Sequence, residues 1–415
     1  MTSHHVPGAS LSTRSLLTVV SATGSLCVLQ VTASVAAADG GPATVILNVN
    51  RELRALGVQS LVLTTDADGA IDRLQVKNGW PVDVNGGLVI SHRVHAPRKA
   101  KSSLGLLITL LWLTPRADVI HVHGLYLFSS LMASIVGKIF RTPVFLQPHG
   151  VLEPYQRQTS PRIKRLYDRL GGSWALRSAQ GVLFASTSEA EHARDLVSAH
   201  KAVIVPLGAA VAEVSLHYVP SWRDRVDAGK PIILFLGRVA PKKRLDLLVQ
   251  CWPRVAESVG ATLVIAGSHS EADRLACEAT TGSRPDVVWL GSVLGVDRDA
   301  LLRQATLFVL PSENENFAIA VAESLVAGTP VVVTREVAMS EVVARTGSGV
   351  VLSKVPTPTE LADTLVAVLS DQGELERMAK AAREVAAPEL SWRGTAESLQ
   401  RVYAAACRTE PGGVT

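Results

Sequence analysis

Short apolar runs alternate with amphipathic stretches along most of the chain. In the first half the apolar runs predict buried strands, at residues 27–31, 60–64, 119–122, 144–146 and 181–185. Helical patterns separate these runs, as at 43–56 and 129–140. After a polar segment the alternation restarts, with strands expected at 232–236, 262–266, 287–290, 307–310 and 330–333 and helices at 245–258, 299–304, 318–327 and 359–369. Strands that alternate with helices of this length predict βαβ units and parallel sheets.

Two such series joined by the polar segment 220–230 predict an α/β protein with two Rossmann-like, doubly wound parallel-sheet domains. We expect an N-terminal tail at 1–24, a first domain at 25–219 and a second domain at 220–388. The last segment, 389–415, contains an amphipathic helical pattern that can cap either domain.

The N-terminus permits two interpretations. Arg14, the apolar stretch 16–35 and the small residues 36–38 are typical of a secretory signal, which would suit an exported α/β ligand-binding protein. Polar residues and a glycine at 21–25 interrupt that stretch, so we favour a tail followed by a buried strand that begins at Leu26. No other segment reaches the roughly 18 consecutive apolar residues that a membrane span needs.

Small aliphatic side chains must do most of the core packing. Hydrophobic residues make up 47% of the chain but aromatic residues only 5%, which suits buried parallel sheets. The cysteines form no C-x-x-C pair, so we expect them to be reduced and buried; they are Cys27, Cys251, Cys277 and Cys407.

Charge is distributed unevenly along the chain. Residues 1–212 contain 20 Lys and Arg against 12 Asp and Glu, whereas the rest contains 21 against 25, within a net charge of +4. A basic first half indicates an anionic partner, which can be phosphate groups, nucleic acid or an anionic membrane surface. A scattered, solvated surface explains the same excess equally well.

A cationic motif follows the first strand of the second series. In Phe235-Leu-Gly-Arg-Val-Ala-Pro-Lys-Lys-Arg-Leu-Asp246 the strand ends at Gly237, Arg238 comes next, and Lys243 stands just before a helix. Ligands of open α/β sheets bind outside the carboxyl ends of the strands. A guanidinium and an ammonium there can clamp a diphosphate. A solvated basic turn accounts for the same residues equally well.

An acidic motif, Leu310-Pro-Ser-Glu-Asn-Glu-Asn-Phe-Ala-Ile-Ala-Val-Ala-Glu323, follows a later strand. We expect a helix that starts near Phe317, whose free N–H groups favour an anion or a hydroxyl oxygen. Glu315 at the loop tip and Glu323 two turns along the helix would share a face to within about 80°. Carboxylates on one face can accept hydrogen bonds from sugar hydroxyls. The alternative is one acid that stabilises the helix dipole and one surface glutamate.

Glycines and histidines follow strands of the first half. Asp39-Gly-Gly-Pro42 opens a helix where glycine permits close approach to a phosphate, although an ordinary turn explains it as well. His121, His123 and the triplet Pro148-His149-Gly150 end two further strands and offer histidines to the same side of a sheet. We find no H-E-x-x-H, no D-x-D at a strand end and no G-x-G-x-x-G after a first strand, so we expect neither a metal site nor a dehydrogenase.

Together these motifs resemble the retaining glycosyltransferases of family 4, which have the GT-B fold. The segment ENENFAIAVAESLVAGTPVVVT is similar to the family's E-x7-E signature, and FLGRVAPKKRLDLL to its diphosphate clamp. GGPATVILNVNRELRALG, ADVIHVHGLY and LQPHGVLEP resemble its N-terminal landmarks. LSWRGTAESLQRVY resembles its closing segment, whose helix crosses back to the first domain. The likeness runs from about Leu26 to Tyr403 and implies two Rossmann-like domains that face a central cleft with the active site.

The resemblance implies how the donor nucleotide would be held. Arg238 and Lys243, next to Gly237, would bind the donor's diphosphate, and Glu323 would bind the ribose. The residues that would line the base pocket are Gly267, Ser292 and Val293.

The resemblance also implies where the transferred sugar would lie. Glu315 would bind it together with backbone N–H groups from Asn316, Phe317 and Ala318. His149 would lie beside the reacting sugar carbon, and Gly41 would contact donor phosphate or acceptor. The residues expected to be catalytic are therefore His149, Arg238, Lys243 and Glu315.

The implied reaction moves a sugar from a UDP- or GDP-sugar to a glycan or lipid-linked glycan with retention of anomeric configuration. Cations and N–H dipoles would stabilise the leaving diphosphate, whose oxygen would take the acceptor proton. No other cofactor, no metal and no nucleic-acid partner is expected. A sugar-nucleotide epimerase or a phosphorylase of the same fold is the alternative. The chain departs from the family at Pro206-Leu-Gly208, often Pro-Asn-Gly, and at Phe317-Ala318, usually Phe-Gly, which bears on the identity of the sugar.

Two basic groups predict that a cytoplasmic protein attaches peripherally to the inner leaflet of the membrane. The first consists of Arg93, Arg98, Lys99 and Lys101. The second is expected on one helix that also carries apolar residues; its members are Arg157, Arg162, Lys164, Arg165 and Arg169, with Leu166, Tyr167, Leu170 and Trp174. Basic residues beside Trp and Leu are typical of an interfacial helix. A solvated helix that packs its Leu and Trp on its own core is the alternative.

Overall fold

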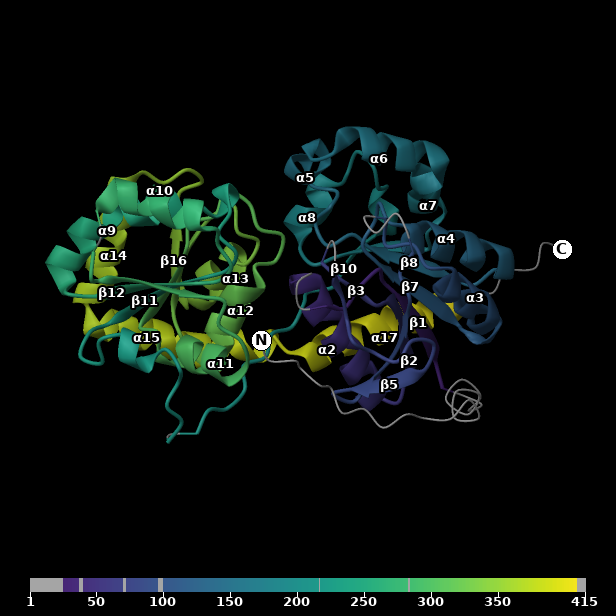
Figure 1. Cartoon of the computed structure of the whole chain (residues 1–415), viewed down its shortest axis with the longest axis horizontal. Coiled ribbons are helices and arrows are strands. Elements are labelled where there is room, and N and C mark those ends of the chain that lie inside the picture. Colours follow the sequence, from purple (N-terminus) through teal and green to yellow (C-terminus); the bar gives the residue numbers. More distant parts are fainter. Residues whose placement is uncertain are drawn as a thin grey trace. The chain divides into compact units, whose positions relative to one another are not determined.

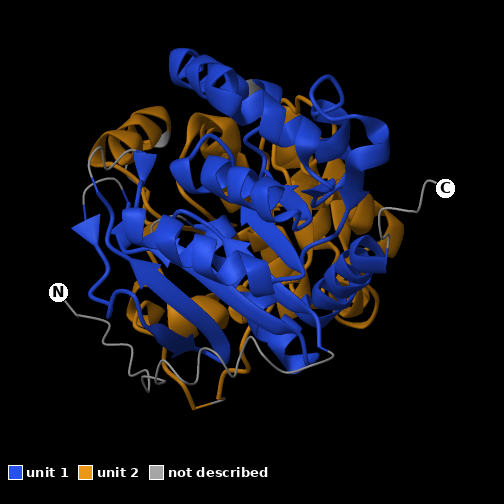
Figure 2. Ribbon diagram, turned by 90° about the vertical axis from the view of Figure 1, so that its right-hand side faces the viewer, with its two compact units in different colours: residues 1–207, 392–415 blue, residues 208–391 orange. Residues whose placement is uncertain are grey.

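The computed structural model of the chain describes residues 25–36, 40–69, 72–95, 100–215, 217–282 and 284–408. The contacts divide it into two compact units, unit 1 with residues 1–207 and 392–415 and unit 2 with residues 208–391 (Figure 2). The tail 1–24, Asp39, Arg98 and Lys99 lie outside the described residues. Among the described helices, none has the length and apolar character needed to cross a membrane.

Unit 1 is built on an eight-stranded sheet with the order β10-β9-β8-β7-β1-β2-β6-β5 (Figure 1). Its pairs are parallel except the β5–β6 pair. The strands are β1 (Cys27–Val31), β2 (Gln59–Thr65), β5 (Pro81–Val84), β6 (Gly87–His92), β7 (Val119–His123), β8 (Val144–Gln147), β9 (Gly181–Phe184) and β10 (Ala202–Ile204). A separate short antiparallel pair is formed by β3 (Ala67–Asp68) and β4 (Asp72–Arg73).

The β5–β6 hairpin is absent from the strands expected from sequence. Its two-residue loop has Asn85 at φ 53° and Gly86 at φ 85°, so both residues are left-handed. This is the conformation of a type I′ turn, which favours an Asn-Gly dipeptide. The Asn-Gly pair between two apolar runs was therefore a signal that could have identified the hairpin.

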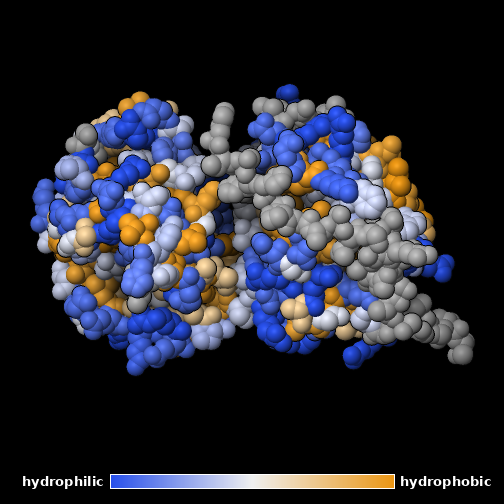
Figure 3. Space-filling view, turned by 60° about the horizontal axis from the view of Figure 1, so that its bottom comes forward, coloured by the Kyte–Doolittle hydropathy of each residue, from blue (hydrophilic) through white to orange (hydrophobic). Residues whose placement is uncertain are grey.

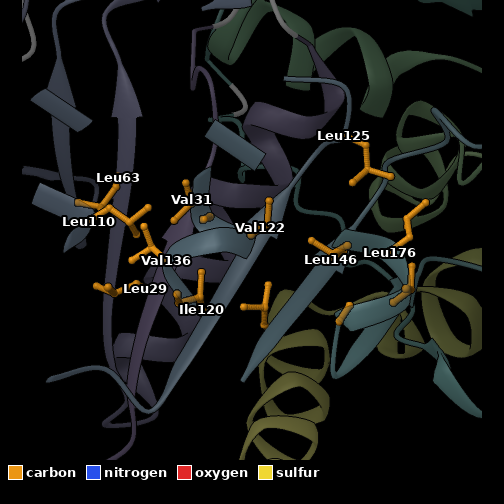
Figure 4. Packing of buried hydrophobic residues seen from close by; sticks show 14 of the residues in the cluster. Leu29, Val31, Leu63, Leu110, Ile120, Val122, Leu125, Val136, Leu146 and Leu176 are labelled. Carbon is orange, nitrogen blue, oxygen red and sulfur yellow. The ribbon is translucent and has the colours of Figure 1, made fainter. Parts of the chain in front are cut away.

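Helices cover both faces of this sheet. They are α2 (Gly41–Ala55), α3 (Leu104–Leu113), α4 (Phe128–Phe140), α5 (Pro154–Gln158), α6 (Pro161–Tyr167), α7 (Ser173–Ser178), α8 (Thr187–His192) and α17 (Trp392–Arg408). The core between the sheet and α3 and α4 consists of aliphatic side chains, including Leu29, Ile120 and Leu146 (Figure 4). Helices of this kind are stabilised mainly by burying an apolar face against the sheet.

The last helix returns the chain to unit 1. α17 packs against α2, and its Tyr403 is fully buried. The Tyr403 hydroxyl lies 2.7 Å from Nδ1 of His121, and the Thr395 hydroxyl donates to the Pro206 carbonyl at 2.9 Å. Unit 1 is therefore assembled from both ends of the described chain.

The single helix expected over residues 157–174 is wrong. The segment contains α5, α6, a π-helical turn at Asp168–Gly172 and α7. Ser160 at φ 53° and Gly171 at φ 131° interrupt the helical path, because left-handed residues cannot continue a right-handed helix.

Unit 2 contains a six-stranded parallel sheet with the order β13-β12-β11-β14-β15-β16. Its strands are β11 (Ile232–Leu236), β12 (Thr262–Ala266), β13 (Val287–Gly291), β14 (Leu307–Leu310), β15 (Val331–Thr334) and β16 (Gly349–Leu352). Its helices are α9 (Leu245–Val259), α10 (Glu271–Thr281), α11 (Gly295–Gln304), α12 (Ile319–Ala327), α13 (Ser340–Thr346), α14 (Pro358–Ser370), α15 (Gln372–Ala381) and α16 (Ala387–Glu389). Counted along the unit, this order is 3-2-1-4-5-6, that of dinucleotide-binding Rossmann domains. The expected architecture of two doubly wound parallel-sheet domains is confirmed.

The expectation that the cysteines are buried holds for only two of them. Cys27 and Cys251 are buried, whereas Cys277 is partly exposed and Cys407 exposed. All four are free thiols. The last two lie on amphipathic helices, α10 and α17, on which about half of the positions face solvent.

Candidate active site

Each sheet has a switch point where consecutive connections leave in opposite directions. In unit 2 it lies between β11 and β14, and in unit 1 between β1 and β7. Ligands of doubly wound sheets bind outside the carboxyl ends of the strands at such points. The candidate residues follow these strands or their neighbours, and the two units are described separately.

The loop after β11 carries the cationic residues of unit 2. Lys243 ends a short 3-10 turn, and its Nζ lies 2.7 Å from Oε1 of Glu315, which follows β14. Lys242 Nζ lies 3.7 Å from the other carboxylate oxygen. The fold thus brings together Lys243 and Glu315, although 72 residues separate them.

Arg238 lies on the same loop, directly after Gly237, and its side chain is exposed. It makes no ion pair or side-chain hydrogen bond with any described residue. A Cβ added at Gly237 would lie 3.3 Å from Lys243 Nζ, so this backbone runs directly beside the ammonium group. Arg238 therefore leaves its guanidinium available to a ligand at the end of β11.

Gly267 has a structural reason to be glycine. Its φ is 136°, and a Cβ there would lie only 2.0 Å from the Gly237 carbonyl oxygen. The loops after β11 and β12 cross at this point, and a side chain would force them apart. Ser292 and Val293 follow β13 at the same edge of the sheet, the former exposed and the latter partly buried.

The backbone around Glu315 is fixed by the loop after β15. The Glu315 N–H donates to the Glu336 carbonyl at 3.2 Å, and its carbonyl accepts from the Ala338 N–H at 3.0 Å. The buried Ser312 hydroxyl donates to the Glu315 carboxylate at 3.3 Å. These bonds hold the carboxylate at the end of β14.

The start of the following helix differs from the expectation. Phe317 is buried but lies before α12, and Ala318 is its N-cap with φ 61° and ψ 64°. The expected placement of Glu315 and Glu323 on one helical face is therefore wrong, because a left-handed residue separates Glu315 from the helix. Asn316 lies with Glu315 in the preceding loop.

Glu323 is buried within α12 and paired with Arg298 of α11. Burial raises the pKa of Glu323 to about 7, against the opposing effect of the Arg298 guanidinium. Arg298 was not among the residues expected from sequence. No periodicity or motif connects it with Glu323, because the pair depends on how α11 packs beside α12.

In unit 1 the predicted glycine lies at the start of a long helix. Gly40 is the N-cap of α2 with φ 68°, and Gly41 is the first helical residue. No side chain caps this end. The first N–H groups of α2 are therefore open to an anion or a hydroxyl oxygen.

The histidines of unit 1 form one connected group. His121 and His123 are buried in β7, and their rings lie 3.9 Å apart. His149, after β8, has φ 54° and stacks on His123 with an interplanar angle of 14°. Burial lowers the pKa of His149 to about 4 and that of His121 to about 3. The group is therefore neutral at physiological pH.

A row of hydrogen bonds connects His149 with Gln30. Gln30 Nε2 donates to the Ser60 hydroxyl at 2.8 Å, and Gln30 Oε1 faces His123 Nε2 at 3.0 Å. In this orientation of the Gln30 amide, His123 carries its proton on Nε2 and accepts with Nδ1. His149 Nε2, 3.1 Å away, is consequently the donor, and His149 Nδ1 carries the lone pair. The Gly150 N–H next to it donates to the buried Glu189 at 2.7 Å.

Within the residues that the structure describes, no group of three or more His, Cys, Asp or Glu side chains is arranged to hold a metal ion. Unit 2 offers a ligand a cationic loop beside a carboxylate, and unit 1 offers a neutral imidazole group.

Two family models match consecutive parts of the chain. Residues 40–208 match the model described as glycosyl transferase 4-like domain, and residues 221–385 match glycosyl transferases group 1. Together the two models cover most of the chain, which therefore belongs to the glycosyltransferases that combine these two domains. Both family descriptions are those of transferases, so an epimerase, a phosphorylase or an exported binding protein is not favoured.

Relatives of this glycosyltransferase have several recorded activities. It is 29% identical to the D-inositol 3-phosphate glycosyltransferase of Xylanimonas cellulosilytica, over 71% of this chain and 73% of that one. It is 26% identical to the 2-deoxystreptamine N-acetyl-D-glucosaminyltransferase of Streptomyces fradiae, over 71% and 74%. An uncharacterized glycosyltransferase of Methanocaldococcus jannaschii is 33% identical, but the match spans 44% of this chain and about half, 49%, of that one.

Solved structures show the same fold. The Anabaena protein HepE, in complex with UDP and glucose, is similar with a TM-score of 0.71 and 18% identity, over 92% of this glycosyltransferase and 100% of HepE. WaaG, a glycosyltransferase involved in lipopolysaccharide biosynthesis, is similar with a TM-score of 0.65 and 16% identity, over 91% and 99%. At such identities the likeness establishes the GT-B fold alone.

Proposed function

We propose that this glycosyltransferase moves a sugar from a UDP- or GDP-sugar to a glycan or lipid-linked glycan and retains the anomeric configuration. The observation that carries the proposal is the meeting of Lys243 and Glu315, with Arg238 exposed beside them, at the switch point of unit 2. A cation pair suits a diphosphate, and a carboxylate suits sugar hydroxyls. The related HepE structure contains UDP and glucose, which fits this division.

The donor would be held mainly by unit 2. Arg238 and Lys243 would bind the diphosphate, which would compete with Glu315 for the Lys243 ammonium. Glu323 would accept hydrogen bonds from the ribose, and the base would lie near Gly267, Ser292 and Val293. These last residues follow β12 and β13, at the same sheet edge as the cationic loop.

The chemical step would consist of leaving-group departure with attack on the same face of the sugar. Negative charge develops on the diphosphate as the glycosidic bond to it breaks, and preorganised cations lower that barrier. The departing phosphate oxygen takes the acceptor proton. Glu315, N–H groups near Ala318, and His149 would position the sugar, and Gly41 would contact phosphate or acceptor. His149 would add no charge beside the sugar, because burial lowers its pKa to about 4 and its imidazole is neutral at pH 7.

Donor identity is tested by screening UDP- and GDP-sugars for thermal stabilisation. A donor at one hundred times its Kd adds about 2.7 kcal/mol to the free energy of unfolding. Product analysis of the stabilising donor should give free nucleoside diphosphate and a new glycosidic bond with the donor's anomeric configuration. An epimerised sugar nucleotide, or an inverted linkage, would refute the proposal.

Transfer is expected to be independent of divalent metal ions, because Arg238 and Lys243 supply the positive charge. Activity should survive EDTA. Complete loss on chelation, restored by Mn²⁺ or Mg²⁺, would overturn this account of leaving-group stabilisation.

We further infer that the enzyme works in the cytoplasm and touches the inner leaflet through unit 1, where a lipid-linked acceptor would be found. Of the basic groups expected from sequence, the second retains exposed apolar neighbours at Ile163, Leu166 and Leu170 despite its broken helix. Each Lys or Arg near an anionic leaflet contributes about 1 kcal/mol, so several suffice for reversible attachment.

A further inference from the structure

Helix α3 is apolar on all sides although it lies at the surface of unit 1. Its sequence, LGLLITLLWL, contains no charged residue. One stripe, Leu106, Leu110 and Leu113, is buried in the core. A helix that is hydrophobic all round is normally buried on every side, so the second stripe of α3 needs an explanation.

The second stripe faces solvent. Leu104, Ile108, Leu111 and Trp112 are 61%, 58%, 39% and 44% exposed. Their spacing of four, three and one residues places them on one face of the helix. Figure 3 shows that apolar residues reach the surface of unit 1, with a group along its right-hand edge. These four exposed side chains form an apolar ridge along α3.

Helix α4 extends this ridge. α3 and the turn Thr114–Arg116 both contact α4, whose last residues Ile139 and Phe140 are 63% and 39% exposed. That turn and the end of α4 each directly precede a strand, β7 and β8, so both lie at the amino-terminal edge of the sheet. We call Leu104, Ile108, Leu111, Trp112, Ile139 and Phe140 the α3–α4 ridge.

Cations flank the α3–α4 ridge. Arg116 lies over the Trp112 ring, 5.1 Å from its centroid, and Lys138 and Arg141 are exposed at the end of α4. Neither α3, nor the turn Thr114–Arg116, nor α4 contains an acidic residue. The charged side chains that these elements and Arg141 bring to the ridge are therefore all cationic.

A polar depression opens beside the same residues. It has a volume of about 550 Å³, and its lining includes Lys138, Arg141, Ser178 and Gln180. Two cations with hydroxyl and amide groups suit a phosphate. The volume falls in the range of about 300–1,000 Å³ that small-molecule sites occupy.

This charge pattern decides between possible occupants of the ridge. A second copy of the chain would bring two cationic faces together, which like-charge repulsion opposes. An anionic bilayer instead offers an apolar layer for the ridge and phosphates for the cations, and tryptophan and arginine suit the boundary between them.

We propose that the α3–α4 ridge inserts into the headgroup boundary of an anionic bilayer, with Lys138 and Arg141 binding a lipid phosphate in the adjoining depression. The proposal rests on the membrane contact of the proposed function and deepens it by adding an apolar surface to the basic group at residues 157–169. The binding itself requires no sugar donor, so it is measured separately from transfer.

The test is co-sedimentation of the full chain with vesicles of phosphatidylglycerol or of phosphatidylcholine, across a salt series. We expect binding to phosphatidylglycerol that weakens with salt. Ile108→Asp with Trp112→Asp should reduce partitioning at least about tenfold, since two apolar anchors are lost. Lys138→Gln and Arg141→Gln should each reduce it roughly fivefold, the value of one charge near an anionic leaflet.

Leu275→Asp is the matched control. Leu275 is 52% exposed on α10 of unit 2, so the substitution makes the same chemical change outside the ridge and should leave vesicle binding unchanged. Thermal unfolding of every variant checks the fold, and transfer to a water-soluble acceptor should match the wild type. Equal vesicle binding by the ridge variant and the wild type would overturn the proposal, as would binding that ignores lipid charge. A dimer in sedimentation equilibrium that the ridge variant dissociates would assign the ridge to a second copy instead. Vesicle binding by a chain that transfers no sugar would refute the proposed function alone.

Discussion

The two switch points use opposite electrostatic designs. In unit 2 the side chains are charged and paired, Lys243 with Glu315 between two loops and Arg298 with Glu323 between two helices. In unit 1 they are neutral imidazoles in a row of hydrogen bonds that begins at Ser60 and Gln30. Charge suits a diphosphate, whereas fixed neutral groups suit a sugar whose reacting carbon becomes positive. Under the proposed function, the charged groups of unit 2 would bind the diphosphate of the donor.

Removing the cations of unit 2 should have the largest effect. Lys243→Ala and Arg238→Ala are each expected to reduce transfer at least about a hundredfold, the cost of losing one preorganised charge donor. Steady-state rates with the identified donor measure this. Lys230→Ala is the matched control, because Lys230 is exposed in the same unit and, among the described residues, its ion pair is with Asp227. Near-wild-type rates in both site variants would refute the clamp.

The hydrogen-bonded histidines of unit 1 should depend on the side-chain amide of Gln30. Gln30→Leu removes the acceptor of the His123 Nε2 proton. His123 can then adopt either tautomer, and so can His149, which is hydrogen-bonded to it. Transfer is expected to fall about tenfold, and the unpaired buried group should lower the free energy of unfolding by about 1–3 kcal/mol. ¹⁵N chemical shifts of His149 report the tautomer directly.

Gln59→Leu provides the comparison for this variant. It also deletes a Gln–Ser hydrogen bond, from Gln59 in β2 to Ser25 at 2.6 Å, but this bond does not reach the histidines. Unchanged His149 shifts in Gln30→Leu would show that the row does not set the tautomer.

Donor binding should depend on pH through Glu323. Its pKa of about 7 means that at lower pH a donor ribose must displace a proton before the carboxylate can accept its hydroxyls. The Kd of a nucleotide sugar is expected to rise by up to tenfold for each pH unit below about 7 and to be constant above it. Calorimetry at several pH values measures this Kd. A nucleotide sugar is used because the terminal phosphate of a free nucleoside diphosphate would itself change charge with pH. A profile that Glu323→Gln leaves unaltered would assign the dependence to another group.

The smallest effect is expected at the N-cap of α12. Ala318 occupies the left-handed region, which costs an L-residue roughly 1–2 kcal/mol, whereas glycine adopts it freely. Because glycine also raises the entropy of the unfolded chain, Ala318→Gly should increase the free energy of unfolding by only about 0.5–1 kcal/mol. Urea denaturation measures it. A loss of stability would mean that the alanine methyl makes compensating contacts.

The sequence predicted what depends on local pattern. Alternating strands and helices identified both sheets, and the strand ends carried Arg238, Lys243, Glu315 and His149. The partners of these residues could not be predicted, because they come from distant segments. Arg298 reaches Glu323 only through the packing of α11 beside α12, and Gln30 reaches His123 across 93 residues. The exposed face of α3 could not be predicted either, because an apolar run of ten residues is typical of a buried segment. The structure shows that the core covers only one face of this helix.

The return of α17 to unit 1 sets an order of events during synthesis. Tyr403 and Trp392 fill buried positions in a unit whose other residues are translated about 200 positions earlier. Until the ribosome has made all of unit 2, α17 does not exist. His121 then lacks the Tyr403 hydroxyl as a partner, and the face of α2 that packs against α17 is exposed to solvent. Unit 1 must therefore remain unfinished on the ribosome while unit 2, whose residues 208–391 are consecutive, can fold as soon as it emerges. Because α17 follows all of unit 2 in the chain, a chain released before α17 is made lacks the helix that completes the core of unit 1.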